Sequence, residues 1–484
     1  MKIRPANLLF ILSDEHSPKA LHCAGHPFVR TPNLDALAAR GTRFSAASTP
    51  SPICVPARAA LATGQPLHRL GRYFDNADPY DGGVRSWHHA LREAGHRVVS
   101  IGKLHFRGAP GDDHGLSEEQ LAMHVVDGKG DLLGLIRDDA MAPRKGAAKL
   151  SGSAGPGESD YTRYDRDITA AAQVWLREEA PRQDRPWCLF VSLVTPHFPL
   201  VAPPEHYYAY RDLPLPKQYA PADRPQHPFL ADYAGTMAYD SHVRDAATVQ
   251  RMMAGYYGLV SFMDEQVGKI LRCLEDCGFA DTTRVLYSSD HGDNVGARGL
   301  WGKSTMYEES VGVPMIMAGE GVAAGRVEAT PVSLTDVHAT VLEAVGVAEA
   351  PPDGSASLFG VAAGAAPADR AVLSEYHATG SRQGAFMLRD RRYKYVRYIS
   401  YPAQLFDLER DPEELADLAG DPAHAATLAA MEARLRAILD PTAVDRAVKA
   451  RQAELVEANG GRQAVLARDD LPYSPPPGVR PAWS

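Results

Sequence analysis

The sequence predicts an α/β fold: a large, mostly parallel β-sheet sandwiched by helices, followed by a small C-terminal antiparallel sheet with one helix. Three observations support this prediction. Apolar runs typical of buried strands alternate with helical patterns over most of the 484 residues, as they do in parallel sheets. Short strands separated by turns follow a small-residue linker at Ala362–Ala368. The composition, with 45% hydrophobic and 23% charged residues, is that of an ordinary globular protein.

Residues 1–365 are predicted to form the large domain. Continuous apolar runs indicate its strands, at Asn7–Leu12, Arg97–Ile101, Trp187–Val194, Thr283–Tyr287 and Val313–Met317. Apolar side chains spaced by three and four residues, with stop signals such as Gly41, predict its helices, at Asn33–Arg40, Trp87–Ala94, Ile168–Glu179 and residues 253–277.

Residues 366–440 are predicted to form a small α+β subdomain. Its expected elements are the strands Val372–Tyr376, Ala385–Leu388, Tyr393–Tyr398 and Gln404–Asp407 and a helix over about Ala423–Leu439. Residues 441–484 form a tail with a helical stretch, Asp445–Glu457, and then a proline-rich arm that holds Tyr473 and Trp483. Because such an arm has too little apolar surface to fold on itself, we expect it to pack on a neighbouring subunit of a homo-oligomer.

Charge and composition exclude several classes of protein. The net charge of −9 argues against a nucleic-acid partner, and no apolar run reaches the ~18 residues that a membrane span needs. The early apolar run Leu8–Leu12 leads into acidic residues rather than a cleavage site, which favours a buried strand over a signal peptide. Five cysteines without framework spacing fit a cytoplasmic protein.

Two predicted strands end in acidic residues. Asp14 closes the first strand, and Asp290 closes the strand that starts at Thr283 and is followed by His291. Ligands bind beyond the carboxyl ends of parallel strands, so Asp14, Asp290 and His291 could hold one divalent cation. An aspartate at a strand end also often caps the next helix, and these residues alone leave both interpretations open.

A short motif, Cys54-x-Pro56-x-Arg58, leads into a predicted helix at Ala59. It belongs to an ordered series that spans the chain: Asn7–Asp14, Thr31–Asp35 with Gly41, Cys54–Arg58 with Gly64, Gly102–His105, Pro196–His197, Ser289–Gly292 and Gly302–Lys303. The whole series resembles the formylglycine-dependent sulfatase family of the alkaline phosphatase superfamily. In that family a formylglycine-generating enzyme is the partner that oxidises the cysteine after translation.

The resemblance implies a sulfuric ester hydrolase that acts on a sulfate monoester of a small organic alcohol or phenol. Hydrated formylglycine at Cys54 would bind the metal through one hydroxyl and attack sulfur with it. The implied metal ligands are Asp14, Cys54, Asp290 and His291. The other implied catalytic residues are Arg58, which positions the hydrate, Lys103, His105, which deprotonates the second hydroxyl, His197, which stabilises the leaving group, and Lys303. Substrate contacts are implied for Lys103, His197 and Lys303, with Asn76 as an added donor.

The pair Asp290-His291 replaces the Asp-Asn of many sulfatases and is similar to the branch that holds choline sulfatases and phosphonate monoester hydrolases. Lys103 and His105 favour the choline-sulfatase type, because phosphonate hydrolases lack both. The family implies calcium, but the imidazole ligand makes manganese a serious alternative. In choline sulfatases C-terminal extensions join subunits, which also points to a homo-oligomer (dimer or tetramer) here.

Two other functions stay open at this point. The nearest is a phosphonate monoester or phosphodiester hydrolase with the same nucleophile and metal site. The other is a non-catalytic binding protein with unconverted Cys54. Glu375 is a candidate for facing a cationic leaving group, and an exposed acid on an edge strand is the alternative for this residue.

Overall fold

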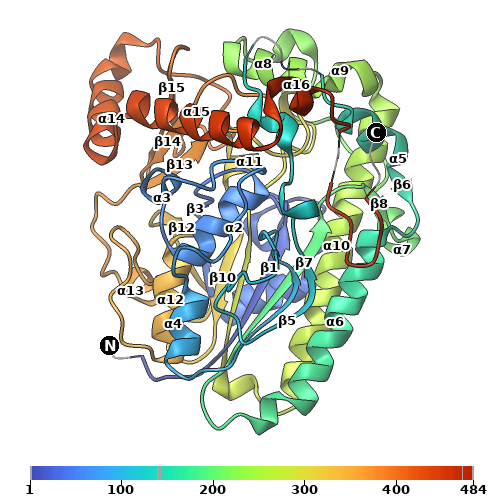
Figure 1. Cartoon of the computed structure of the whole chain (residues 1–484), viewed down its shortest axis with the longest axis vertical. Coiled ribbons are helices and arrows are strands. Elements are labelled where there is room, and N and C mark those ends of the chain that lie inside the picture. Colours follow the sequence, from blue (N-terminus) through green and yellow to red (C-terminus); the bar gives the residue numbers. More distant parts are fainter. Residues whose placement is uncertain (1–2, 139–140, 142, 471–472, 482–484) are drawn as a thin grey trace.

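The computed structural model describes residues 3–138, 141, 143–470 and 473–481 (Figure 1). Its main element is an eight-stranded sheet with the order β11-β2-β10-β9-β1-β7-β4-β5. The bounds of these strands are β1 (Asn7–Asp14), β2 (Gly41–Phe44), β4 (Val98–Lys103), β5 (Glu118–Met123), β7 (Cys188–Pro196), β9 (Thr283–Ser289), β10 (Met315–Ala318) and β11 (Arg326–Glu328). Two short ribbons pair β3 (Ala47–Ser48) with β12 (Val332–Ser333) and β6 (Gly155–Pro156) with β8 (Val201–Ala202).

The first strand of the chain lies at the centre of the sheet. β1 pairs in parallel with β7 on one side and with β9 on the other. The expected strand near Val313–Met317 is present as β10, but it runs antiparallel to β9 and to β2. The sheet is therefore mixed at this side, and mostly parallel as predicted.

Helices cover both faces of the sheet (Figure 1). Their bounds are α1 (Pro32–Ala39), α2 (Cys54–Thr63), α3 (Leu67–Leu70), α4 (Trp87–Glu93), α5 (Gly146–Ser153), α6 (Asp160–Glu178), α7 (Pro204–Tyr207), α8 (Pro228–Met237), α9 (Tyr239–His242), α10 (Ala246–Asp276), α11 (Glu308–Val311), α12 (Asp336–Val345) and α13 (Leu358–Ala362). Successive β1 side chains point to opposite faces: Leu8 and Phe10 enter the core formed with α2, α4 and α12, whereas Leu9 and Ile11 enter the core formed with α1, α6 and α10. Burial on both faces explains why β1 reads as a continuous apolar run.

The C-terminal subdomain has the predicted form. An antiparallel sheet of β13 (Val372–Tyr376), β14 (Ala385–Arg389), β15 (Tyr393–Tyr398) and β16 (Gln404–Asp407) packs against α14 (Ala425–Ile438). Beyond it follow α15 (Pro441–Ala458) and α16 (Gly461–Leu466).

The tail departs in part from the expectation. α15 packs on its own chain, because Val448 is fully buried against Ala60, Leu67 and Phe74, and a contact of the arm with a neighbouring subunit stays a prediction. Trp483, the other aromatic residue expected in the arm, lies outside the described residues.

Two general features of the structure bear on the environment of the protein. In the part of the chain that the structure describes, no helix has both the length and the apolar character needed to cross a bilayer. All five cysteines are free thiols.

Candidate active site

The candidate site lies where four neighbouring strands of the large sheet end. Asp14 and Lys103 are the last residues of β1 and β4, while His197 and Asp290 directly follow β7 and β9. The strand order β9-β1-β7-β4 therefore brings four of the expected side chains to one edge of the sheet, as expected for the carboxyl ends of parallel strands.

The helix α2 brings Cys54 to this edge. Cys54 is the first residue of α2, and every residue of the helix is buried. The helix ends at Gly64, whose φ of 69° is left-handed and whose place for a Cβ is taken by the His338 ring. The N-terminus of a helix favours negative charge, so the dipole of α2 acts on residue 54 in the opposite sense to burial and to the neighbouring carboxylates.

Four potential metal ligands converge in the structure. One ligand atom from each of Asp14, Cys54, Asp290 and His291 lies within 4.8 Å of the other three. Sγ of Cys54 is 3.1 Å from His291 Nε2 and 3.6 Å from Asp14 Oδ1. If Cys54 is oxidised to formylglycine, as the resemblance implies, an oxygen would take the place of Sγ.

The ligand atoms are held in position by neighbouring groups. Arg58 donates to the outer carboxylate oxygens, with Nε 2.8 Å from Asp290 Oδ2 and Nη2 3.1 Å from Asp14 Oδ2. Each inner Oδ1 therefore remains directed at the cluster. His291 Nδ1 lies 3.0 Å from the carbonyl oxygen of Gly292; because a carbonyl only accepts, Nδ1 carries the proton and Nε2 presents its lone pair. Two carboxylates and one neutral imidazole fit one divalent cation.

A second group of possible ligands, Asp14, Glu15 and His197, adjoins the first. Here the ammonium of Lys303 lies 3.2 Å from Glu15 Oε2, and His197 Nε2 lies 3.3 Å from the same oxygen. Lys103 Nζ is 2.5 Å from Asp14 Oδ2. These two ammonium groups supply the positive charge beside the second group of carboxylates. The arrangement therefore fits one metal cation, held by the first group, rather than two.

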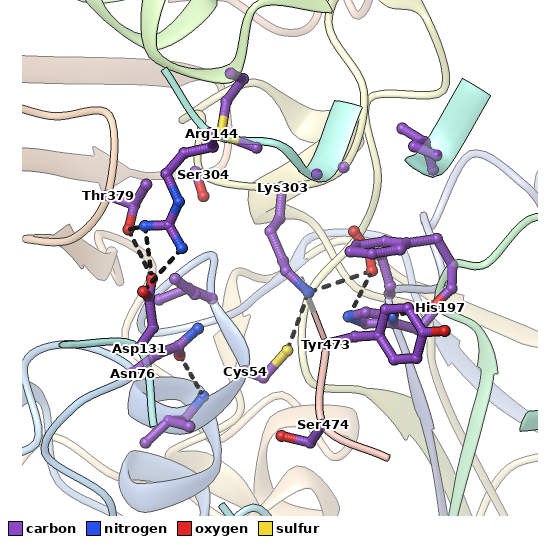
Figure 2. A pocket seen from close by; sticks show the side chains of 18 of the residues that line it. Cys54, Asn76, Asp131, Arg144, His197, Lys303, Ser304, Thr379, Tyr473 and Ser474 are labelled. Carbon is purple, nitrogen blue, oxygen red and sulfur yellow. Dashed lines mark hydrogen bonds and ion pairs between the residues drawn. The ribbon is translucent and has the colours of Figure 1, made fainter. Parts of the chain in front are cut away.

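The remaining expected side chains lie around Cys54, and Figure 2 labels Asn76, His197 and Lys303 among them. Lys303 Nζ lies 3.0 Å from Sγ of Cys54. His105 and His197 line the same pocket, and both ring nitrogens of His105 are buried without a hydrogen-bond partner. Asn76 also lines the pocket and accepts a 3.3 Å hydrogen bond from the backbone N–H of Val55. All ten expected site residues thus lie around one pocket or its metal cluster.

Burial and neighbouring charges set the protonation of the site. Burial and the nearby Asp14 carboxylate raise the pKa of the Cys54 thiol to about 12. Burial would raise the pKa of Asp14, yet the ammonium of Lys103 leads the charges that hold it well below the ordinary value. Burial and Lys103 lower the pKa of His105 well below its ordinary value, so this imidazole is neutral.

The pocket above Cys54 is a cavity of about 160 Å³. Its walls are largely apolar and aromatic, with Ile53, Val125, Leu150, Tyr161, Phe198, Tyr233, Tyr239 and Tyr473 among the lining residues. Part of the wall comes from the C-terminal tail: the ring of Tyr473 packs edge-on against Tyr161 at 5.3 Å between centroids. Tyr161 Oη also donates a 2.6 Å hydrogen bond to the carbonyl of Ser474.

One wall of the pocket carries charged groups that the sequence analysis missed. Arg144 donates to Asp131 Oδ1 at 2.8 Å and to Asp470 Oδ1 at 2.7 Å, with Thr379 beside them (Figure 2). These residues come from separate parts of the chain and share no motif, so no sequence signal could have joined them. Glu15 was also missed, although its position next to Asp14 was a usable signal.

Glu375 corrects a further expectation. It does not line the pocket and is fully buried rather than exposed. Its carboxylate lies 2.7 Å from His68 Nδ1 and 3.4 Å from His377 Nε2. Glu375 therefore links β13 to α3 and does not face a leaving group.

Comparisons with known proteins agree with this geometry. A family model described as Sulfatase matches residues 6–347, and one described as N-sulphoglucosamine sulphohydrolase, C-terminal, matches residues 296–440. The chain is 34% identical over 429 residues to a choline-sulfatase of Rhizobium meliloti (strain 1021), covering 84% of this chain and 81% of the relative. It is 26% identical over 440 residues to arylsulfatase K of Homo sapiens, covering 84% and 78%. A phosphonate monoester hydrolase of Agrobacterium radiobacter shares the fold, with a TM-score of 0.73, 24% identity and coverage of 98% and 100%.

Proposed function

Since the chain belongs to the sulfatase family and is a sulfuric ester hydrolase, we propose that it hydrolyses sulfate monoesters of small alcohols or phenols. The proposed nucleophile is formylglycine formed from Cys54, beside one divalent cation, calcium or manganese. The main support for this proposal is the set of groups that surround Sγ of Cys54. Sγ of Cys54 has potential metal ligands on one side and the ammonium of Lys303 at 3.0 Å on another.

The formylglycine and the cation would supply the reactive chemistry. Hydrated formylglycine offers two hydroxyls on one carbon, one to attack sulfur and one whose deprotonation releases sulfate and restores the aldehyde. Asp14, Asp290, His291 and residue 54 would hold the cation, which would favour the deprotonated form of a neighbouring hydroxyl. Overall, the ester and one water yield the alcohol and hydrogen sulfate.

The other site residues are proposed to bind the sulfuryl oxygens, to stabilise the leaving oxygen and to accept a proton. Lys103 and Asn76 are proposed to bind the sulfuryl oxygens, which need positive charge and donors as the S–O bond breaks. Lys303 and His197 are proposed to stabilise the leaving oxygen, and their shared contact with Glu15 holds them on one side of Cys54. His105 is proposed to take the proton from the second hydroxyl, which its neutral and unpartnered ring supports.

The cavity supports a small substrate. A space of about 160 Å³ with aromatic walls suits a compact alcohol or phenol better than a polymer chain. Because a relative is named choline-sulfatase, choline sulfate is the first alkyl ester to test, beside 4-nitrophenyl sulfate as an aryl ester.

The test of the nucleophile is peptide mass spectrometry across Cys54, with the kinetics of Cys54→Ala and Cys54→Ser alongside. We expect an aldehyde at position 54 in active protein and a loss of ~10⁴-fold or more in kcat for the alanine variant. Active protein with a fully unmodified cysteine, or an alanine variant that turns over at the parent rate, would refute the proposed mechanism. An unmodified and inactive protein would instead fit a binding function.

The second candidate is a phosphonate monoester or phosphodiester hydrolase. The pair Asp290-His291 is compatible with it, because this pair is similar to the branch that contains both activities. Lys103 and His105 favour the sulfatase, because the phosphonate hydrolases lack both. Paired kinetics on 4-nitrophenyl sulfate and a phenyl phosphonate ester separate the two, and a higher kcat/KM for the phosphonate would reverse our preference.

We also propose the partners and setting of the enzyme. Oxidation of Cys54 requires a formylglycine-generating enzyme. The free thiols support a cytoplasmic location, and a homo-oligomer (dimer or tetramer) remains our expectation for the assembly.

A further inference from the structure

Helix α15 lies beyond the residues that the two family models match, which end at 347 and 440. In Figure 1 it crosses the upper part of the view, above α2. Its side chain at Gln452 is only 3% exposed and contacts the loop that carries Asn76. This places a residue from the last part of the chain directly behind the candidate active site.

Every hydrogen-bonding group of the Gln452 amide is used. Nε2 donates to Asp75 Oδ2 and to the carbonyl of His377, both at 2.8 Å. Oε1 accepts a 3.0 Å hydrogen bond from Arg137 Nη1. The site thus needs a donor and an acceptor on one short side chain, which an amide provides and a hydrocarbon or a carboxylate does not.

The contact continues from Gln452 to the nucleophile. The second carboxylate oxygen of Asp75 accepts a 2.7 Å hydrogen bond from the N–H of Ala77, so the Asp75 carboxylate spans residue 76. Asn76 Oδ1 in turn accepts from the N–H of Val55, the neighbour of Cys54 in α2. With its oxygen held by that N–H, the Asn76 amide keeps its Nδ2 donors for the pocket (Figure 2).

We propose that Gln452 is a positioning residue for sulfuryl transfer. It fixes the Asp75 carboxylate, and through Asp75 it fixes the orientation of the Asn76 amide toward the transferred group. This inference rests on the proposed function, because Asn76 is there assigned to the sulfuryl oxygens. It makes α15 part of the active-site scaffold, a role that lies outside both matched regions.

Other contacts hold α15 in place without Gln452. Val448 is buried against Ala60 and Phe74, and Arg451 pairs with Asp78 at 3.1 Å. Loss of the Gln452 amide should therefore leave the helix docked and change only the hydrogen bonds that it makes.

The test compares Gln452→Met and Gln452→Glu, which remove the two N–H donors in different ways. Glu454→Gln is the matched control, because Glu454 lies on the same helix with its side chain 69% exposed. In both Gln452 variants we expect kcat/KM to fall about tenfold and the Kd for inorganic sulfate, measured by calorimetry, to rise by a similar factor. The control should match the parent, and thermal melting checks that each variant is folded.

A double-mutant cycle tests whether Gln452 acts through Asn76. In an Asn76→Ala background, Gln452→Met should change kcat/KM and the sulfate Kd by less than about twofold. The positioning role of Gln452 is overturned if both Gln452 variants keep the parent kcat/KM and sulfate Kd. It is also overturned if the effect of Gln452→Met persists in full in the Asn76→Ala background, or if Asn76→Ala itself changes neither quantity. Failure of the proposed function shows separately, as a parent enzyme without sulfate-ester turnover, and the sulfate Kd still decides the positioning.

Discussion

The ammonium of Lys303 lies 3.0 Å from Sγ of Cys54, within direct reach of any group that residue 54 would attack. Its position is set from the other side by Glu15, whose carboxylate is fully buried and also contacts His197. A cation held in a buried site next to the proposed nucleophile can neutralise charge on a leaving oxygen without reorganising.

Replacing Lys303 with alanine should therefore reduce kcat/KM by ~10²- to 10⁴-fold. The loss should be greater for sulfates of less acidic phenols, because a more basic leaving oxygen depends more on the lysine. A series of aryl sulfates with leaving phenols of different pKa measures this. Lys269→Ala, which removes a surface partner of Glu265, is the control, and an equal loss across the series would contradict the role.

The imidazole ligand should set the metal preference of the site. His291→Asn replaces a nitrogen that presents its lone pair to the cluster with a harder amide oxygen, so the Ca²⁺/Mn²⁺ affinity ratio should rise by ~10-fold or more. Elemental analysis of protein purified without added metal, followed by competition between the two ions, measures the change. A parent protein without a stoichiometric divalent ion would refute the site, and an unchanged ratio would show that His291 does not select the metal.

The Glu375 carboxylate should make the fold sensitive to acid. Burial alone would raise the pKa of Glu375, but hydrogen bonds from His377 and His68 lower it from 4.5 to about 2. A depressed carboxyl pKa contributes stability above the unfolded value, and this contribution is lost as pH falls from about 4.5 toward 2.

Glu375→Gln should accordingly be less stable than the parent by up to ~3 kcal/mol at pH 7. The difference should shrink as the pH falls below 4.5. Denaturant unfolding at a series of pH values measures it. A difference that stays constant down to the lowest pH would show that the ionisation of Glu375 is not responsible.

A chain that ends at Asp440 should lose its activity while keeping the small C-terminal sheet. The truncation removes Val448 and Gln452, which pack against the segments that carry Asn76 and α2. Circular dichroism and sulfate-ester kinetics on the truncated and full chains check this. Parent-level activity in the truncated chain would contradict the proposed role of α15.

The assembly requires a separate measurement. We expect light scattering to give the full chain the mass of a dimer or tetramer. If the arm after Asp440 joins the subunits, as the sequence predicts, the truncated chain should be a monomer. An oligomeric truncated chain would show that other surfaces form the interface. A monomeric full chain would refute the expected homo-oligomer.

The buried parts of the fold could be predicted from the sequence because burial leaves a strong pattern. β1 and β7 are covered on both faces, so their sequences are continuous apolar runs. The positions of Asp14 and His197 at the ends of these strands could therefore be predicted. The edge strand β5 begins with Glu118 and Glu119, has no such run, and was missed. The direction of β10 was also missed, because an apolar run does not encode the direction of its partner.

The parts of the candidate site that could not be predicted from the sequence were missed for a similar reason. Local motifs marked Cys54 and Lys303, whereas the partner of Glu375 is His68, which is far away in the sequence and identifiable only once β13 lies beside α3. The contribution of Tyr473 to the pocket was missed for the same reason, since its contact with Tyr161 depends on the path of the tail.

The central position of β1 has a consequence for how the protein is made. β1 emerges from the ribosome before its neighbours β7 and β9, which end only at Pro196 and Ser289. At ~5 to 20 residues per second, synthesis from Cys54 to Ser289 takes on the order of 10 to 50 s. Throughout that interval the edge of the sheet that buries Cys54 cannot be complete. Translation itself thus provides a period in which the proposed formylglycine-generating enzyme can reach the cysteine before the finished fold encloses it.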